Sequence, residues 1–470
     1  MDCIKLSEFY NSDFVNYSSY DNLRKISQID GLKNASRKII YTLLEKNVKN
    51  FVKVSQLGAM ICQFSDYLHG NLDNVVVTLG QNYAGTNNVP LIEKKGNFGT
   101  RFSNDASAAR YIFAKGSDEL FKLFKKEDTA ILVNQYFEGY KIEPQFYVPT
   151  LPVLLLNGSE GISSGFAQKI LPRDPKKIKK YILDKLNGKN PRGDFTPAFN
   201  GFSGTVKQGE TPNQWLIEGV VEKVAKNKVL IKEVPIGYDL KSYLKTLDSL
   251  EDDKKIISYK DLSDDDIFSF EVTFNSKDLE SMSESEILER LKLIKKVSEN
   301  YTILDENNKI KEFNSAKEIC DYYLSFKLKY IQKRKDYLIS KSKEDLSIIK
   351  SKLIFIKGVI ENSILVSKKS KDQIVKQLQE IKDIVLVNDS YDYLLKMPIY
   401  SLTTEKIKEL NELYKKTEIS LKELSNSTIE DIWIKDLEEL WYMKWTNCLK
   451  IQVLNLSLMN FRFVHKWFWN

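Results

Sequence analysis

The sequence predicts a multidomain α+β chain that ends in a long antiparallel coiled coil, and three observations support this. With 470 residues, the chain is too long for one hydrophobic core and suggests two to four structural units. Short helical segments come first, β-rich runs follow, and heptad-spaced apolar residues fill the last third. A composition of 42% hydrophobic and 29% charged residues is typical of globular rather than disordered proteins.

After an N-terminal segment of residues 1–27, residues 28–170 are predicted to form a winged-helix (CAP-like) domain. A helix opens at the Asp-Gly-Leu-Lys sequence of residues 30–33, and further helical stretches cover 54–68 and 72–83. Three short helices before a glycine-rich extended segment are typical of a helix-turn-helix with a wing. Periodicity alone also fits other small helical domains.

Residues 171–318 are predicted to form an α+β domain with few chemical signals. Short β-rich runs, such as 228–231 and 268–274, alternate there with polar turns. Three consecutive aspartates at 264–266 resemble a metal-binding sequence in composition. No strand-borne glutamate accompanies them, so we interpret them as a solvated turn.

Residues 319–440 are strongly helical in pattern and are predicted to form the coiled coil. Apolar positions alternate in steps of three and four in two runs, Leu346, Ile349, Leu353, Ile356 and Ile360, and then Ile407, Leu410, Tyr414, Thr417, Leu421 and Leu424. A segment around 374–398 separates the runs, so we expect an antiparallel pair of helices with a knob at its tip. Two helices of a bundle core would give a similar pattern. Residues 441–470 form an aromatic-rich tail of unknown role.

Arginine is the scarce basic residue, so its positions are informative. Only nine of 71 basic residues are arginine, and the net charge of +7 permits a nucleic-acid partner without requiring one. An arginine kept in a lysine-rich chain indicates a planar, bidentate phosphate contact, because lysine lacks that geometry. Arg37, Arg101 and Arg110 lie in the sequence blocks described below, and His69 is one of only two histidines.

The dipeptide Arg110-Tyr111 is the most informative candidate site. A tyrosine hydroxyl has an ordinary pKa of about 10 and is a poor nucleophile at neutral pH. A protonated guanidinium cannot act as its base, but it can hold a phosphate and stabilise the charge that grows during attack. The pair therefore suits phosphodiester cleavage through a phosphotyrosine intermediate, although an isolated Arg-Tyr pair is more often an ordinary surface dipeptide.

Five sequence blocks occur in consistent order between residues ~10 and 440. They are Asp-Gly-Leu-Lys at 30–33 with Arg-Lys at 37–38, Tyr-Leu-His-Gly at 67–70, Gly-Asn-Phe-Gly-Thr-Arg at 96–101 leading to Arg-Tyr-Ile-Phe at 110–113, Glu-Pro at 143–144 leading to Asn-Gly-Ser-Glu-Gly-Ile at 157–162, and Tyr-Leu-Leu-Lys-Met-Pro-Ile at 393–399. Together they resemble the DNA breakage-reunion subunit of a type IIA DNA topoisomerase, above all the medium subunit of T-even-like bacteriophage enzymes. Two positions depart from the family pattern: Asn34 replaces a proline, and Leu68 replaces the first of two histidines.

This resemblance implies a catalytic set. Tyr111 would attack a backbone phosphate and become joined to the DNA 5′ end, in a transient double-strand break that permits strand passage and religation. Arg110 would stabilise the transition state. Arg37 and His69 would hold the same phosphate from the same subunit.

The resemblance also implies DNA-binding residues and the nature of the later domains. Lys33, Lys38 and Arg101 would contact DNA, although Lys33 and Lys38 fit an ordinary solvated surface equally well. Ile162 would insert between base pairs and bend the duplex, as apolar wedges do in other DNA-bending proteins, although the residue alone would more often be assigned to a core. Residues 171–318 would be the tower domain, and 319–440 the coiled coil with its C-gate knob.

Cofactors and partners follow from the same resemblance. The family's chemistry uses Mg²⁺ held by a Toprim domain and ATP held by an ATPase domain, and this sequence contains neither pattern. We therefore expect no metal site in this chain, with Mg²⁺ and ATP bound by ATPase/Toprim partner subunits. The expected assembly is a homodimer of this chain, those partners and double-stranded DNA.

The expected location is the cytoplasm, which would be that of the host cell if the chain is phage-encoded. No apolar run approaches the ~20 residues needed to cross a bilayer, and the first residues lack the apolar centre of a signal peptide.

Two other functions compete with this interpretation. A tyrosine recombinase surrounds its tyrosine with several arginines and histidines from a longer catalytic domain, whereas Tyr111 lies early and the coiled coil lies far downstream. The alternative from another class is a non-catalytic winged-helix DNA-binding protein with a coiled-coil dimer arm. The blocks around Arg110-Tyr111 and Ile162 argue against it.

Overall fold

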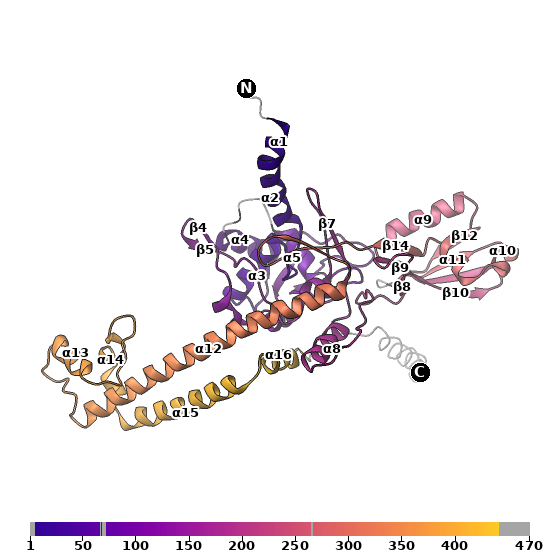
Figure 1. Cartoon of the computed structure of the whole chain (residues 1–470). Helices are drawn as coiled ribbons and strands as arrows, with labels where there is room; N and C mark the ends of the chain where they lie inside the picture. The colour runs from indigo at the N-terminus through magenta and orange to yellow at the C-terminus, as the bar shows by residue number, and fades with distance from the viewer. Residues whose placement is uncertain (1–4, 66, 68–71, 265–266, 441–470) are drawn as a thin grey trace, which may run out of the picture. The chain divides into compact units, whose positions relative to one another are not determined.

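The computed structural model describes residues 5–65, 67, 72–264 and 267–440 (Figure 1). The chain divides into two compact units: one runs to Lys327 and resumes at Ile434, and the other is Leu328–Trp433. The first contains both helices and sheets and the second is helical, which confirms the predicted mixed α+β class. Within the described ranges, no helix is both long and apolar enough to cross a membrane.

The first unit begins with a helical run and continues into short helices around a small sheet. These elements are α1 (Leu6–Phe9), a π-helical turn (Tyr10–Phe14), α2 (Val15–Lys25), α3 (Asn34–Glu45), β1 (Val52–Lys53), α4 (Val54–Phe64), α5 (Asp73–Gly80), β2 (Ile92–Lys95) and β3 (Phe113–Gly116). Strand β3 is central and pairs antiparallel with β1 and β2. The apolar face predicted for α3 is buried at Ile39, Ile40 and Leu43. The predicted second helix ends at Phe64, because Ser65 leaves the helical conformation at φ −107°.

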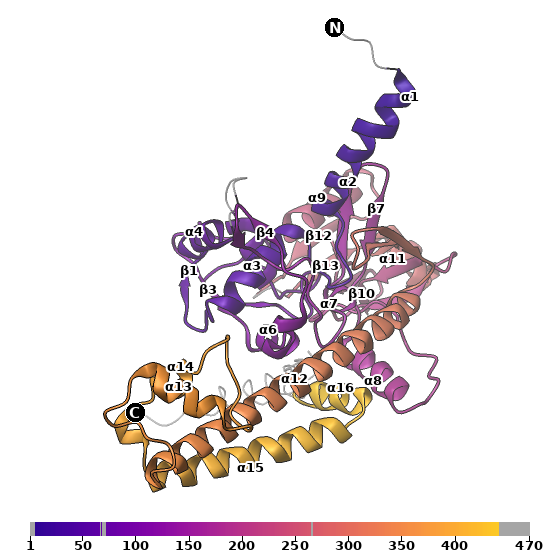
Figure 2. The ribbon, with the colours of Figure 1, turned by 60° about the vertical axis from the view of Figure 1, so that its left-hand side comes forward.

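The chain then forms short elements that lead into a hairpin. They are α6 (Asp118–Leu123), a 3₁₀ turn (Lys126–Ile131), β4 (Tyr136–Phe137), β5 (Tyr140–Lys141), α7 (Val153–Asn157), β6 (Ser159–Ile162), β7 (Ala167–Ile170) and α8 (Pro175–Leu186). Strands β6 and β7 pair antiparallel, with Ser159 opposite Ile170 and Ile162 opposite Ala167. The hairpin stands beside α2 in both ribbon views (Figures 1 and 2).

The rest of the first unit is built mainly from two antiparallel sheets. Its elements are β8 (Thr205–Gln208), β9 (Gln214–Glu218), β10 (Val220–Ala225), β11 (Lys228–Glu233), α9 (Leu240–Asp252), β12 (Ser258–Asp261), β13 (Phe270–Thr273), α10 (Ser276–Ser281), α11 (Glu284–Arg290), β14 (Ile294–Ser298), β15 (Tyr301–Leu304) and β16 (Ile310–Phe313). The sheet orders are β10-β11-β13-β12 and β14-β9-β8. The predicted runs 228–231 and 268–274 correspond to β11 and to β13, which is shorter than expected. Asp264 and Ile267 exchange two backbone hydrogen bonds of 3.2 and 2.9 Å, as in a tight turn, while Asp265 and Asp266 lie outside the described residues.

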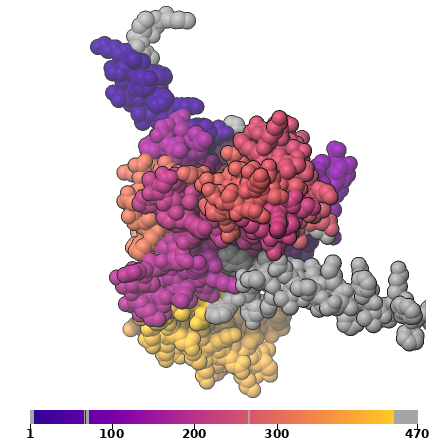
Figure 3. All heavy atoms as spheres, turned by 90° about the vertical axis from the view of Figure 1, so that its right-hand side faces the viewer, coloured from indigo at the N-terminus to yellow at the C-terminus, as the bar shows by residue number. Residues whose placement is uncertain are grey.

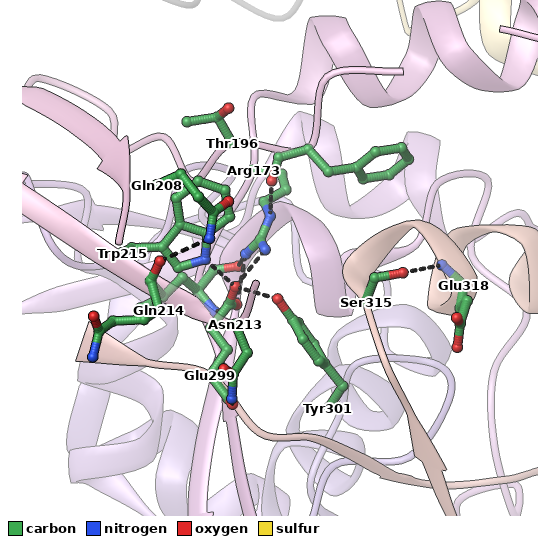
Figure 4. Close-up of polar contacts among 12 residues, drawn as sticks. Arg173, Thr196, Gln208, Asn213, Gln214, Trp215, Glu299, Tyr301, Ser315 and Glu318 are labelled. Carbon is green, nitrogen blue, oxygen red and sulfur yellow. Dashed lines mark hydrogen bonds and ion pairs between the residues drawn. The ribbon is translucent and has the colours of Figure 1, made fainter. Parts of the chain in front are cut away.

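A buried ion pair fastens the end of the β6–β7 hairpin to the second of these sheets. Two guanidinium nitrogens of Arg173 donate to the two carboxylate oxygens of Glu299 at 2.8 and 2.6 Å, and both side chains are almost fully buried. Trp215 Nε1 and the Tyr301 hydroxyl donate to the same carboxylate, each at 2.7 Å (Figure 4). Burial and this carboxylate raise the pKa of the Tyr301 hydroxyl, which keeps it protonated as a donor. The Leu171 N–H also donates to Glu299, at 2.6 Å.

The second unit contains two long helices that run antiparallel. Its elements are α12 (Ala316–Ile360, entered from the first unit), α13 (Lys371–Gln379), α14 (Asp392–Leu395), a 3₁₀ turn (Ile399–Ser401), α15 (Thr404–Asn426) and the beginning of α16 (Ile429–Glu438). Near one end, Lys335 Nζ donates to the carbonyl oxygens of Ser425 and Ser427 at 3.2 and 2.7 Å. Farther along, Leu353 of α12 clusters with Leu410 of α15. Both ribbon views show the two helices side by side (Figures 1 and 2).

The segment between α12 and α15 forms a separate small core together with the end of α12. It is formed by buried apolar side chains of Phe355, Ile364, Ile374, Leu378, Ile384, Tyr391 and Leu394. The segment that separates the two heptad runs is therefore a packed structure of its own.

We expect Glu299→Ala to lower the free energy of unfolding by about 3–5 kcal/mol, because it leaves the buried Arg173 guanidinium without its counter-charge. Glu210→Ala is the matched control, since Glu210 pairs with Lys296 while its side chain is 79% exposed, and such surface pairs are worth roughly 0–1 kcal/mol. Urea denaturation followed by circular dichroism measures both variants. Equal losses in the two would contradict a special role for the buried pair.

Candidate active site

Tyr111 projects from the end of a loop, immediately before β3. Its side chain is largely exposed, at 68%, while its backbone N–H donates to Ala108 O at 2.9 Å. The next residue, Ile112, is buried, and its carbonyl accepts from the N–H of Val54 at the start of α4 at 3.0 Å. The backbone is thus held on both sides of a phenol that faces solvent.

The loop before Tyr111 is held by its own polar groups. Asn97 Oδ1 accepts from the Gly99 N–H at 2.8 Å, and the Asn97 carbonyl accepts from the Ser107 N–H at 3.0 Å. Gly99 has φ +87°, and a Cβ there would lie 2.6 Å from Asn104 O. Glycine is therefore required at this position for both conformation and space.

Arg110 is exposed, and its guanidinium carbon lies 5.0 Å from the centroid of the Tyr111 ring. This is within the range of a cation–π contact. Arg110 donates no hydrogen bond to any residue that the structure describes. Its guanidinium is therefore next to the phenol and has donors available for another group.

Arg37 lies in the first turns of α3 and is held by Asp30. Its Nε donates to Asp30 Oδ2 and its Nη2 to Asp30 Oδ1, each at 3.0 Å, and Nη2 also donates to the Leu32 carbonyl at 3.1 Å. Both charged side chains are buried. Nη1 donates to no described residue, so two N–H groups of an otherwise fixed guanidinium remain available.

The Asp-Gly-Leu-Lys sequence makes this arrangement possible. The Asp30 carboxylate also accepts from the N–H groups of Leu32 at 2.9 Å and Tyr147 at 3.0 Å. Gly31 has φ +79°, and a Cβ there would lie 2.4 Å from the backbone nitrogen of Leu154. The glycine thus allows the turn to pack directly on α7, and the aspartate satisfies donors from three segments.

Lys33 and Lys38 both have partners within the protein. Lys38 Nζ donates to the Ser65 carbonyl at 2.8 Å and to Glu143 at 2.9 Å. Lys33 Nζ donates to the Glu160 carbonyl at 2.6 Å. Burial lowers the pKa of Lys33, and the charge of Glu160 partly opposes this shift.

Arg101 is turned towards the segment that precedes α9. Its guanidinium donates to the carbonyl oxygens of Val234, Pro235 and Tyr238 at 2.9, 3.2 and 3.1 Å. Burial lowers its pKa, and Glu233, whose carboxylate lies 3.7 Å away, opposes this. These contacts join the loop that leads to Tyr111 to the domain carrying β11.

Ile162 is the last paired residue of β6, and its side chain is 76% exposed. This is unlike a core residue, and it places an apolar side chain at the tip of the hairpin. His69 lies outside the described residues. Among the residues that the structure does describe, no hydrogen bond joins Arg37 to Tyr111, and no group of three or more His, Cys, Asp or Glu side chains could hold a metal ion.

Comparison with known proteins shows to which family the chain belongs. The family model for the DNA gyrase/topoisomerase IV A-subunit matches residues 24–438. The chain belongs to this family. It is also 33% identical to DNA topoisomerase 2 of Plasmodium falciparum and 30% identical to that of Saccharomyces cerevisiae, with alignments covering 92% and 93% of this chain. It spans about a third of the length of these relatives, 34% of each.

A solved structure gives the same result at the level of the fold. The chain is similar to the crystal structure of the Plasmodium falciparum topoisomerase II DNA-binding, cleavage and re-ligation domain, with a TM-score of 0.83 and 32% identity. The match covers 96% of this chain and 65% of that one. A viral relative, DNA topoisomerase 2 of Acanthamoeba polyphaga mimivirus, is 28% identical over 93% of this chain.

The sequence blocks predicted the candidate cations Arg37 and Lys38 but not the carboxylates that accept their hydrogen bonds. Asp30 and Glu143 belong to the sequence blocks, yet nothing in the sequence pairs Glu143 with Lys38 across 105 positions. Asp30 and Arg37, by contrast, are only seven residues apart at the start of a helix. Their pairing therefore left a local signal in the sequence.

Arg37→Lys is expected to lower the free energy of unfolding by about 1–3 kcal/mol, since an ammonium cannot bond both oxygens of Asp30 and the Leu32 carbonyl in the same plane. Arg110→Lys is the matched control and should change it by no more than about 0.5 kcal/mol, because Arg110 is exposed. Thermal unfolding of the two variants tests this. A greater loss in Arg110→Lys would mean that Arg110 supports the fold.

Proposed function

We propose that this chain is the DNA-cleaving subunit of an ATP-dependent type II DNA topoisomerase. The observation that carries the proposal is the exposed Tyr111 on a fixed loop beside Arg110, whose guanidinium donates to no described residue. Membership in the DNA gyrase/topoisomerase IV family supports it. The likeness to a DNA-binding, cleavage and re-ligation domain favours a cleaving role over a non-catalytic DNA-binding protein.

The reaction follows from the chemistry of the phenol. The Tyr111 oxygen attacks a backbone phosphorus and forms a P–O bond while the bond from phosphorus to the 3′ oxygen breaks. The phenolic proton passes to water, and the leaving 3′ oxygen takes a proton from water and becomes a hydroxyl. The DNA 5′ end then carries a phosphotyrosyl ester, and attack by the same 3′ hydroxyl reverses the step and reseals the strand. Two copies of the chain, each supplying one tyrosine, break both strands and allow another duplex to pass.

Arg110 and Arg37 have complementary roles in this proposal. Arg110 stabilises the charge that develops on the phosphate, because preorganised donors act most strongly where charge grows. Arg37 is fixed by Asp30 and offers Nη1, which donates to no described residue, to the same phosphate. His69 is the third proposed phosphate ligand.

The proposed DNA surface includes Lys33, Lys38 and Ile162. The two ammonium groups bond to protein oxygens at 2.6–2.9 Å, so in this proposal they act on the DNA phosphates mainly through their positive charge. Ile162 is the proposed wedge. Arg101 already donates to three carbonyls, so a DNA contact there requires release of these bonds, and its contacts support a role in holding the loop.

The domain assignment is part of the same proposal. Residues 28–170 form the winged-helix cleavage domain and 171–318 the tower. Residues 319–440 form the coiled coil and C-gate, which the antiparallel packing of α12 and α15 supports.

Mg²⁺ and ATP are proposed to be bound by ATPase/Toprim subunits that join a homodimer of this chain. The metal would supply charge that stabilises the leaving 3′ oxygen. We expect the isolated chain to bind DNA but to cleave it poorly even with Mg²⁺, and addition of the partner to restore cleavage. Gel assays of linear product measure this, and efficient Mg²⁺-dependent cleavage by the chain alone would place the metal site within it.

Tyr111→Phe should abolish covalent protein–DNA adducts and strand passage in the complete enzyme, because the nucleophilic oxygen is removed. Duplex affinity should stay nearly unchanged, since it depends on many phosphate contacts. Denaturing gels detect the adduct, and fluorescence anisotropy measures affinity. Tyr136→Phe is a matched control because Tyr136 is also exposed, at 66%. Adducts that persist in Tyr111→Phe would show that another residue is the nucleophile.

Arg110→Lys should slow single-turnover cleavage by at least ~10²-fold, the usual scale for removal of one preorganised transition-state donor. Lysine keeps the charge but loses the planar fork of donors, so DNA affinity should fall little. Cleavage at the wild-type rate would leave Arg110 as a general electrostatic contact.

A further inference from the structure

Residues 163–166 follow Ile162 and connect β6 to β7. The Ser163 N–H donates to Phe166 O at 2.9 Å across the four-residue bend that connects the two strands. Gly165 occupies its third position at φ +83°, a conformation that favours glycine. Ile162 therefore stands directly before a tight turn, and its direction depends on where that turn is held.

Asp21 of α2 holds this turn through a single carboxylate oxygen. Its Oδ2 accepts from the Ser163 hydroxyl, the Ser164 hydroxyl and the Ser164 N–H, each at 3.0 Å. Lys25, one helical turn later, lies 3.0 Å from Oδ1. Asp21 is 8% exposed, so these bonds are largely shielded from water.

A second residue on the same face of α2 completes the contact. Ser18 donates its hydroxyl to the Ser164 carbonyl at 2.9 Å, and residues three apart in a helix are neighbours on its surface. The peptide groups on both sides of Ser164 thus bond to α2, one through its N–H and the other through its carbonyl. Figure 3 shows the tip of the hairpin packed against the lower part of the N-terminal helix.

The base of the hairpin is held by other residues. The Ser27 and Ser159 hydroxyls are 2.7 Å apart, and Gln168 donates to the Thr302 carbonyl at 2.8 Å. Gly161 lies so close that a Cβ would be 2.1 Å from Lys25 O. Because these contacts fix the base, loss of Asp21 would release the tip and leave the strands in place.

The polar contacts of Asp21 go to the Ser163–Ser164 turn and to Lys25. Aspartate within a helix is less favourable for the helix than most residues. Its bond to Lys25, together with those from Ser164 and Ser163, lowers the pKa of Asp21 to about 2. The carboxylate is therefore charged throughout the neutral range.

We propose that Asp21 is a positioning residue for DNA bending, which holds the Ser163–Ser164 turn on α2 so that Ile162 projects in a fixed direction into the duplex. The proposal rests on the wedge role proposed above for Ile162. A wedge on a loose turn would lose part of its insertion energy to the ordering of the turn. The N-terminal helix thereby takes part in bending DNA through a turn about 140 residues away in the sequence.

The first measurement examines the turn without DNA. Hydrogen exchange of the peptide containing residues 163–166 should be faster in Asp21→Ala than in the wild-type chain, because the Ser164 N–H loses its acceptor. Asp431→Ala is the matched control, since Asp431 accepts a backbone N–H and a hydroxyl from Thr428 but is distant in the sequence from the hairpin. Unchanged exchange in Asp21→Ala would overturn the proposal.

The second measurement examines bending, by fluorescence transfer on an end-labelled duplex with the full-length chain. Asp21→Ala should lose at least half of the transfer change, with a Kd within about threefold of wild type, because many phosphate contacts remain. Cleavage by the complete enzyme should fall by up to about 10²-fold, the scale for misplaced groups. Wild-type bending in Asp21→Ala, even with faster exchange, would overturn the positioning role.

Variants of Ile162 separate this proposal from the one on which it depends. If Ile162→Ala bends DNA normally, the wedge role fails and the positioning role fails with it. If Ile162→Ala loses bending and Asp21→Ala does not, only the positioning role fails. In the double variant the two losses should not add, because both act on one wedge, and additive losses would contradict the proposal.

A variant outside α2 covers the case in which Asp21→Ala does not fold. Replacing Ser163 and Ser164 together by alanine removes two of the three turn donors to Asp21 and leaves the helix unchanged. It should also reduce bending, though less than Asp21→Ala, because the Ser164 N–H remains. Full wild-type bending by this variant would count against the proposal.

Discussion

The burial of the Asp30 carboxylate is the constraint on which the rest of the site depends. An isolated buried carboxylate is strongly unfavourable, so each of its acceptor positions must be filled, here by Arg37, the Leu32 N–H and the Tyr147 N–H. These donors come from the start of α3 and from a segment more than 100 residues later. One carboxylate thus sets the entry into α3, the approach of residue 147 and the orientation of a guanidinium whose Nη1 donates to none of the described residues.

Most of the other cations are also bonded to oxygens of the protein. The positive charges of the candidate site therefore fall into two groups, those held by protein oxygens and those that donate to no described residue. Lys33, Lys38 and Arg101 each donate to oxygens of the protein, whereas Arg110 is exposed and donates to no described residue. Arg37 is fixed by Asp30, and its Nη1 donates to no described residue, so it needs no reorganisation when a phosphate arrives, which is the property that makes preorganised electrostatics effective. Arg101 would first have to release its bonds to three carbonyl oxygens. Arg110 lies beside the proposed nucleophile, where its donors can bond the phosphate as negative charge develops. The proposed cleavage chemistry needs both kinds.

The sequence predicted those features that leave a local or periodic trace. The buried face of α3 and the contacts between α12 and α15 followed from apolar spacing, because one face of each helix must be buried. Tyr111 and Arg110 were predicted as site residues from their sequence block, and the structure shows that both are exposed. Contacts that join distant segments left no such trace: Lys38 with Glu143, Arg173 with Glu299 and Asp21 with Ser164 are 105, 126 and 143 positions apart. Serine, aspartate and glutamate at these positions look like ordinary surface residues until the fold brings them together.

Ile162 illustrates why exposure and rigidity must be considered together. An isolated exposed isoleucine is common on protein surfaces and indicates no function. At 76% exposure, however, this side chain sits on a hairpin whose base is fixed by Ser27 and whose tip is fixed by Asp21. Unstacking a base step costs a few kcal/mol, and a wedge that also had to be ordered on binding would lose further free energy. In the proposed wedge role, the bonds at the tip would remove that second cost before DNA arrives, so the polar contacts on α2 would determine how much of the apolar insertion is available to bend the duplex.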